Sequence, residues 1–222
     1  GKIVELKGKS YIMVKPSGAR YINEIEDRLI ESHLTIDSRY YVEDWETVAN
    51  ELYKDEIKKH NPIFYEDFQA HIWVNKYFFG NQALVYVFKR NEQTYQNLLD
   101  ETFKLKQLIR GDLNATKDGT CMFIIDINKI DISGRINENN GRVTITNNGE
   151  SIEFDDMIGQ LGRWKSYFLN YVHCPDAKPE EFERELSILS QFGIFDEKNR
   201  VSEESFALCK RMRSCNRPYS NR

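Results

Sequence analysis

Two kinds of hydrophobic pattern follow one another along this chain, and their order limits the folds that it can adopt. Short apolar or alternating runs are typical of strands, whereas apolar residues at helical spacing indicate amphipathic helices. The patterns predict strands over 10–14, 33–42 and 83–89, and helices over 19–32, 45–53, 62–77, 92–103 and 179–191. Because strands and helices are interleaved, we expect an α+β fold with a mixed or antiparallel sheet.

A hairpin-rich segment interrupts this order before the last strand and helix. From Thr120 to Phe154, β-branched residues alternate with polar ones, and the runs are broken by Ser133-Gly134, Asn139-Asn140-Gly141 and Asn147-Asn148-Gly149. Asn-Gly between two alternating runs is the strongest short signal for a β-hairpin. The segment is therefore predicted to form hairpins of its own.

Composition excludes several classes of protein. With 222 residues and 40% hydrophobic residues, the chain can form one large domain, or an ordinary domain with an elaboration. A net charge of −4 is not that of a general nucleic-acid binder. The longest apolar run, Ala83 to Phe88, is far shorter than the roughly 20 residues of a membrane span. We expect a cytoplasmic protein with no membrane partner. Its basic tail, 205–222, is either solvated or bound to an anionic partner.

Four short motifs carry candidate chemistry. They are Val14-Lys15-Pro16-Ser17-Gly18, Ile109-Arg110-Gly111-Asp112, Asn170-Tyr171-Val172-His173-Cys174-Pro175-Asp176 and Glu183-Arg184-Glu185-Leu186. In this order they resemble the K-P-D-G, I-R-G-D, N-x-x-H-x-S-D and E-x-E motifs of the nucleoside diphosphate kinase family. The resemblance covers 10–112 and 165–190. It implies a single domain over 1–222 with a ferredoxin-like, four-stranded antiparallel sheet covered by helices, and a β-rich insertion over 113–164.

His173 is the candidate nucleophile. It ends an apolar segment and precedes Pro175, so its imidazole should lie at a sheet edge near a loop. A neutral imidazole nitrogen is nucleophilic near neutral pH and can attack phosphorus. The resemblance implies that Glu185, one turn into the following helix, holds the other ring nitrogen. Without the resemblance, a lone histidine such as His173 is more often structural, and Glu185 could be an ordinary exposed helix residue.

Lys15 and Arg110 are the candidate phosphate-binding cations. Phosphoryl transfer depends mostly on positioning and charge stabilisation. Lys15 follows a buried strand and precedes a Pro-Ser-Gly turn, which is a rigid place to present an ammonium group. The alternatives are a surface lysine and an arginine paired with Asp112. The resemblance also implies nucleotide contacts from Tyr53, Phe64, Thr102 and Asn170. Asn170 would face the pocket of His173 only if the strand bulges, because a spacing of three breaks the strand period.

Three positions depart from the family pattern. Gln96 stands where the family has a cleft arginine, Pro175 where it has a serine, and Ser17 where it has an aspartate. We therefore expect a nucleotide-dependent phosphotransferase that works through a phosphohistidine and moves the γ-phosphate of a nucleoside triphosphate to a nucleoside diphosphate or related acceptor. Mg²⁺ bound through the nucleotide phosphates and a homo-oligomer are also expected. Two alternatives stay open: a kinase of another small molecule, and a catalytically reduced nucleotide-binding or interaction module.

Overall fold

The computed structural model describes residues 6–59, 69, 71–110, 136–139, 142–147, 149–155, 171–204 and 206. In chain order, its elements are β1 (Ser10–Val14), the 3₁₀ turn η2 (Pro16–Tyr21), α1 (Ile22–Glu31), β2 (Thr35–Val42), α2 (Trp45–Lys59), the π-helical turn η3 (Asn75–Phe79), β3 (Ala83–Lys89), α4 (Tyr95–Arg110), β4 (Ile136–Asn139), β5 (Arg142–Asn147), β6 (Glu150–Asp155), β7 (Val172–His173), α5 (Pro179–Gln191), η6 (Glu197–Asn199) and β8 (Arg200–Val201).

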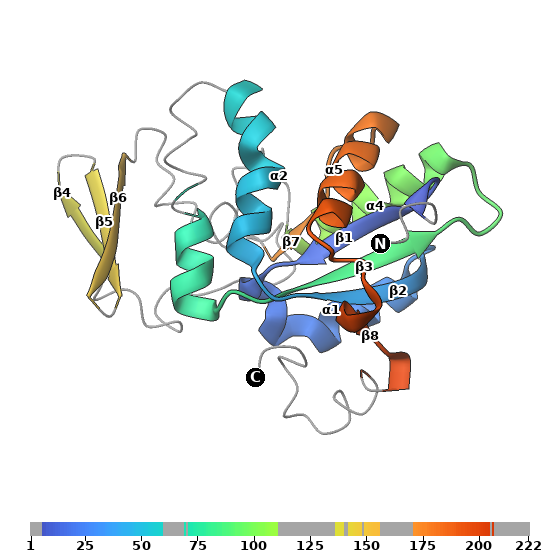
Figure 1. Ribbon diagram of the computed structural model, residues 1–222, viewed down its shortest axis with the longest axis horizontal. Coiled ribbons are helices and arrows are strands. Elements are labelled where there is room, and N and C mark those ends of the chain that lie inside the picture. The colour runs from blue at the N-terminus through green and yellow to red at the C-terminus, as the bar shows by residue number, and fades with distance from the viewer. Residues whose placement is uncertain are drawn as a thin grey trace.

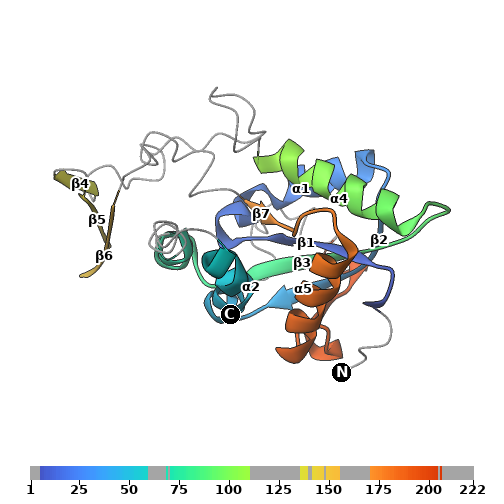
Figure 2. The same ribbon diagram turned by 90° about the horizontal axis from the view of Figure 1, so that it is seen from above.

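A five-stranded antiparallel sheet organises the molecule, in the order β7-β1-β3-β2-β8 (Figure 1). The helices α1 and α4 cover one face of this sheet, and α2 and α5 cover the other (Figure 2). All residues of β1 are buried, as are all of β3 except Lys89, because both faces of these central strands are covered. The sheet confirms the expected antiparallel α+β fold: β7-β1-β3-β2 are the four expected strands, and the short β8 adds a fifth.

Most predicted elements agree with the structure, and α4 is the main correction. The strands at 10–14 and 83–89 and the helix at 179–191 have the predicted bounds. The helix predicted over 92–103 instead runs from Tyr95 to Arg110. Leu105 and Ile109 are buried and continue the apolar stripe of the helix, so Ile109-Arg110 is a helix end and not part of a loop.

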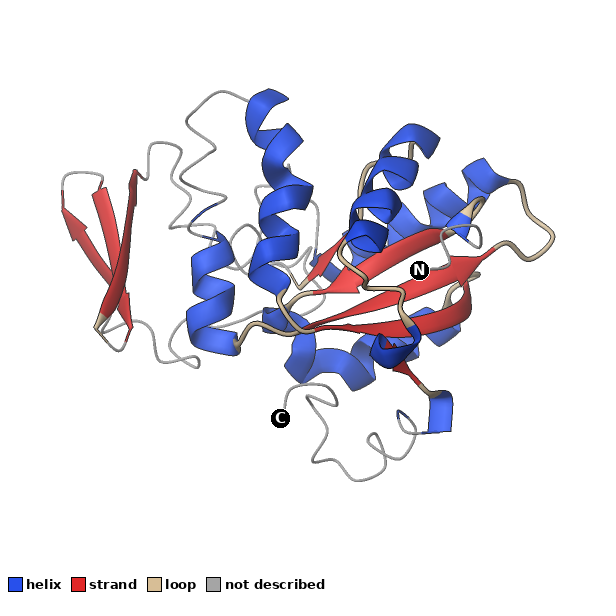
Figure 3. Cartoon of the chain, in the orientation of Figure 1, coloured by secondary structure: helices blue, strands red, loops and turns tan. Residues whose placement is uncertain are grey.

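The predicted hairpins form a separate three-stranded antiparallel sheet, β4-β5-β6 (Figure 3). Asn139 pairs with Arg142 and Asn147 pairs with Glu150, so the paired strand ends are separated by two residues in the sequence in both cases. Gly149, in the second turn, has φ 83°, a backbone conformation that glycine adopts without strain. The rest of the predicted insertion over 113–164 lies outside the described residues. The tail over 205–222 also does, except for Phe206.

One expectation from composition, on membrane spans, can be compared with the described part of the chain. None of its helices is long and apolar enough to cross a membrane. Cys174 is buried and forms no disulfide, and its thiol lies 3.9 Å from the Thr102 carbonyl oxygen. The other three cysteines lie outside the described residues.

Candidate active site

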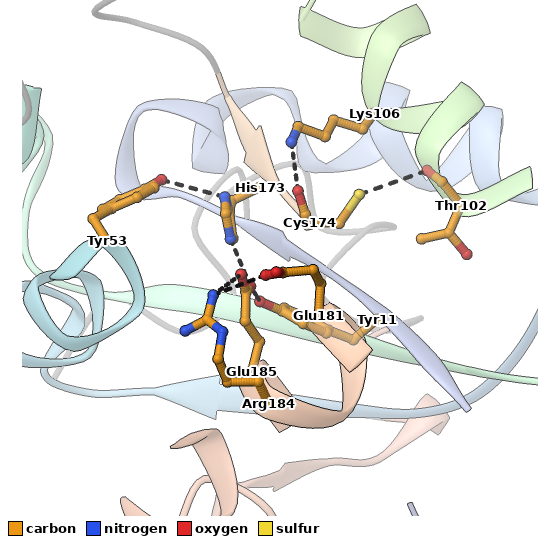
Figure 4. Close-up of polar contacts among 9 residues, drawn as sticks. All are labelled: Tyr11, Tyr53, Thr102, Lys106, His173, Cys174, Glu181, Arg184 and Glu185. Carbon is orange, nitrogen blue, oxygen red and sulfur yellow. Dashed lines mark hydrogen bonds and ion pairs between the residues drawn. The ribbon is translucent and has the colours of Figure 1, made fainter. Parts of the chain in front are cut away.

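The centre of the site is the contact between His173 and Glu185 (Figure 4). His173 lies on β7, at the edge of the sheet, and pairs with Met13 of the buried strand β1. Its Nε2 is 2.8 Å from Oε1 of Glu185, which projects from α5. Both side chains are buried, with 9% of His173 and 3% of Glu185 exposed. The strand and the following helix therefore bring together two of the predicted residues.

The surroundings of His173 keep its imidazole neutral. Burial first, and the cations Lys106 and Lys15 to a smaller extent, lower the pKa of His173 from 6.5 to about 4, although the neighbouring Glu185 raises it. Because the Glu185 carboxylate only accepts hydrogen bonds, Nε2 of the neutral ring carries the proton. Nδ1 therefore keeps its lone pair. The Tyr53 hydroxyl lies 3.4 Å from Nδ1 and is the donor at that atom.

Several groups hold Glu185 as an ionised acceptor. The Tyr11 hydroxyl donates to Glu185 Oε1, and Nη2 of Arg184 lies 3.3 Å from Oε2. Burial alone would raise the pKa of Glu185, but His173, the Tyr11 hydrogen bond and Arg184 lower it below its ordinary value. Burial and the neighbouring Glu185 raise the pKa of Tyr11 well above its ordinary value, so its hydroxyl stays protonated. These contacts fix both the tautomer and the orientation of the His173 ring.

Lys15 reaches the same region from the end of β1. Its backbone N–H donates to the Tyr171 carbonyl at 2.8 Å, which joins the Lys-Pro-Ser-Gly turn to the start of β7. The turn packs so closely that a Cβ on Gly18 would lie 2.7 Å from the Tyr171 carbonyl oxygen. The Lys15 side chain is 2% exposed, and its Nζ is 5.6 Å from the centre of the Tyr53 ring. Lys15 and His173 therefore both adjoin Tyr53.

Among the other predicted residues, only the side chain of Thr102 is described. Thr102 is fully buried on α4, where its hydroxyl lies 2.6 Å from Ser10 Oγ and donates to the Leu98 carbonyl at 2.8 Å. The structure does not bring this hydroxyl to His173 (Figure 4). Arg110 ends α4, but its side chain lies outside what is described, as do Phe64 and Asn170. Nucleotide contacts from these four residues stay predictions.

Sequence reasoning missed Tyr11, described above, and three further buried polar residues near the site. Nζ of Lys106 donates to the Cys174 carbonyl, directly after His173. Nε2 of His71 is 3.1 Å from Nζ of Lys15, and Asn75 Oδ1 accepts from the Ser17 N–H at 2.9 Å. These contacts join residues far apart in the chain, so no local pattern indicates them. Only Lys106 had a local indication: the apolar stripe of α4 continues through Leu105 to Ile109 and places Lys106 next to it.

The described residues offer no ready-made metal centre. Among them there is no group of three or more histidine, cysteine, aspartate or glutamate side chains that could hold a metal ion. The carboxylate at the centre of the site, Glu185, is occupied by His173, Tyr11 and Arg184. Mg²⁺ bound through the nucleotide phosphates stays a prediction.

No protein-family model matches the chain, and no curated protein sequence matches it. Among solved structures, the chain is similar to a nucleoside diphosphate kinase from Borrelia burgdorferi with bound vanadate and ADP, at 15% identity and a TM-score of 0.45 over 91% of this chain and 95% of that one. It is also similar to a nucleoside diphosphate kinase family protein from Babesia bovis, at 16% identity and a TM-score of 0.43 over 87% and 92%. A third similar structure is the enzyme of Halobacterium salinarum in complex with CDP, at 15% identity and a TM-score of 0.45 over 90% and 96%. At these values, the function has to be inferred from the residues of this chain.

Proposed function

We propose that this chain is a nucleotide-dependent phosphotransferase that carries the phosphoryl group on Nδ1 of His173. The arrangement of the His173 ring supports the proposal most. Its Nε2 is held 2.8 Å from the buried carboxylate of Glu185, and its pKa is lowered to about 4. A neutral, oriented imidazole with a lone pair on the other nitrogen is what nucleophilic attack on phosphorus requires.

In the first half-reaction, the Nδ1 lone pair attacks the γ-phosphorus of a nucleoside triphosphate. The bond from phosphorus to the bridging oxygen breaks, and the nucleoside diphosphate leaves. The phosphorylated ring keeps its Nε2 proton, and the Glu185 carboxylate stabilises the positive charge that the ring gains. Lys15 supplies an ammonium group for the charge on the transferred phosphoryl oxygens.

In the second half-reaction, a phosphate oxygen of the acceptor attacks the phosphorus, and Nδ1 recovers its lone pair. The acceptor is a nucleoside diphosphate or a related molecule. Before Nδ1 can attack the γ-phosphorus in the first half-reaction, the Tyr53 hydroxyl, which lies 3.4 Å from Nδ1, has to move away from that nitrogen. Mg²⁺, when it arrives with the nucleotide, supplies further neutralisation of the phosphate charge.

The test is incubation with γ-labelled ATP and Mg²⁺. We expect an acid-labile, base-stable label on the protein, which is typical of phosphohistidine. His173→Ala should abolish the label in a chain that still folds, whereas a matched change at the exposed His33, His33→Ala, should leave the label unchanged. A His173→Ala chain that still takes the label would remove His173 as nucleophile.

Two further outcomes distinguish the alternative functions. A parent chain that binds nucleotide but never takes a label would be a nucleotide-binding module. A labelled chain that passes phosphate only to an acceptor other than a nucleotide would be a kinase of another small molecule. A panel of acceptors offered to the pre-labelled protein makes this second distinction.

A further inference from the structure

The helical segment 71–79, which precedes β3, lies beside α2 in both views (Figures 1 and 2). Two of its buried side chains contact the turn 15–18, called the Lys15 turn below. His71 contacts the side chain of Lys15, and Asn75 binds the backbone of the turn that follows. We propose that His71 and Asn75 are positioning residues, which fix the Lys15 ammonium group where it meets the transferred phosphate. The inference rests on the proposed function. Neither residue belongs to the four motifs that first drew attention to the site.

The contact between His71 and Lys15 has a defined polarity. An ammonium group has three donors and no acceptor, so Nε2 of His71 accepts from Nζ of Lys15 across 3.1 Å. The His71 proton is then on Nδ1, so the Asn75 amide nitrogen, 3.4 Å from Nδ1, donates to the His71 carbonyl and not to the ring. The ring packs edge-on against Trp45 and Tyr53, with centroid distances of 6.0 and 6.3 Å. These aromatic neighbours keep the accepting nitrogen aimed at Lys15.

Asn75 holds the other end of the turn. Its side chain is fully buried, its Oδ1 accepts from the Ser17 N–H at 2.9 Å, and its Nδ2 donates to the His71 carbonyl at 3.1 Å. Asn75 is also the first residue of η3. Single π-helical turns re-aim side chains and are frequent at functional sites. The same segment therefore holds both the Lys15 side chain and the backbone two residues beyond it.

Precise placement of the cation matters because a small displacement of a charged group weakens its contact with the transition state. A free lysine side chain has four flexible carbon–carbon bonds and many rotamers. His71 selects one of these orientations, and Asn75 keeps the backbone from which the side chain starts in place. Loss of His71 should therefore act on the rate of transfer at saturating nucleotide, and not only on nucleotide affinity.

The first experiment measures the rate of label incorporation from γ-labelled ATP at saturating nucleotide. His71→Asn should slow labelling by about 10-fold or more, because its shorter amide cannot reach Lys15. His71→Gln should keep most of the rate, because its amide oxygen lies near the position of Nε2. His33→Asn is the matched control at an exposed histidine and should label like the parent. Equal rates for the two His71 variants would overturn the inference.

A double-mutant cycle then tests whether His71 acts through Lys15. Lys15→Met, His71→Asn and the combined variant are compared in the labelling rate. We expect His71→Asn to have almost no effect when Lys15 is already methionine. If it slows the Lys15→Met chain as much as it slows the parent, His71 acts elsewhere and the inference is wrong.

A binding measurement separates failure of this inference from failure of the proposed function. The same cycle is measured as affinity for an ATP analogue with a non-hydrolysable β,γ-imido bridge, in the presence of Mg²⁺. Coupling between the two residues in affinity, without any label on the parent chain, would support positioning and refute phosphotransfer. If the parent chain takes the label but neither measurement shows coupling, phosphotransfer is supported and positioning by His71 is refuted. A chain that does not bind the analogue and takes no label would overturn both.

Discussion

The low pKa of His173 makes stability depend on pH in a defined window. Burial, with a smaller effect of Lys106 and Lys15 and against the effect of Glu185, lowers this pKa from 6.5 to about 4. Above pH 7 the ring is neutral in both the folded and the unfolded chain. Between pH 6.5 and 4, the unfolded chain binds a proton that the folded chain does not. The free energy of unfolding should therefore fall as pH falls through this window, by about 3 kcal/mol in total from this group.

The assay is urea unfolding of the parent and of His173→Gln between about pH 3.5 and 8. The glutamine amide can still donate to Glu185, but it does not titrate. Subtracting the two curves removes the titration of the carboxylates that do not contact His173. The parent should lose about 3 kcal/mol relative to the variant as pH falls.

A second measurement follows the ring itself. NMR titration of the folded chain should show His173 unprotonated at pH 5.5, and labelling from γ-labelled ATP should persist at that pH. A difference curve that is flat with pH, or a folded-state titration near pH 6.5 or above, would refute the reasoning. The ion pair with Glu185 would then outweigh burial.

Three other changes can be tested with the same methods. Lys15→Ala and Arg110→Ala should each slow labelling on the order of 10²-fold at saturating nucleotide, by analogy with removal of one transition-state contact. An unchanged rate for either variant would show that this residue does not stabilise the transferred phosphate. Gly18→Ala should lower the free energy of unfolding in urea by about 1–3 kcal/mol, because its Cβ would lie 2.7 Å from the Tyr171 carbonyl oxygen; an alanine chain as stable as the parent would show that the turn can move aside. Replacing 120–155 with a short Gly/Ser linker should leave labelling intact. It should remove either transfer to the natural acceptor, measured by an acceptor assay, or the native oligomer, measured by size-exclusion chromatography. A folded deletion variant that cannot be labelled would place the insertion in the nucleotide site.

The fold was predictable where the hydrophobic pattern is strong. The buried strands β1 and β3 are continuous apolar runs, and α5 has a clear stripe that begins at a proline. The end of α4 was predicted wrongly because the family resemblance indicated a loop at Arg110, although Leu105 and Ile109 continue the helical pattern. The two-residue strand β8 was missed because so short a segment has no periodicity, and it becomes a strand only by pairing with β2.

The site divides in the same way between local and distant information. His173, Glu185 and Lys15 lie in short motifs, so the sequence alone marked them as candidates. His71 and Asn75 were not marked, because a histidine and an asparagine four residues apart on a helix have no distinctive pattern. Their partners are Lys15 and the Ser17 backbone, more than 50 positions earlier in the chain, and only the tertiary fold brings them together.

The strand β8 also bears on how copies of this chain can associate. It pairs with the outer side of β2, with Arg39 opposite Val201 and Tyr40 opposite Arg200. An uncovered outer strand offers amide and carbonyl groups to which a second molecule can add its own strand. Here the C-terminal part of the chain already satisfies that stretch of β2. A second molecule that adds a strand at Arg39 and Tyr40 would therefore have to displace β8 or exchange it between copies.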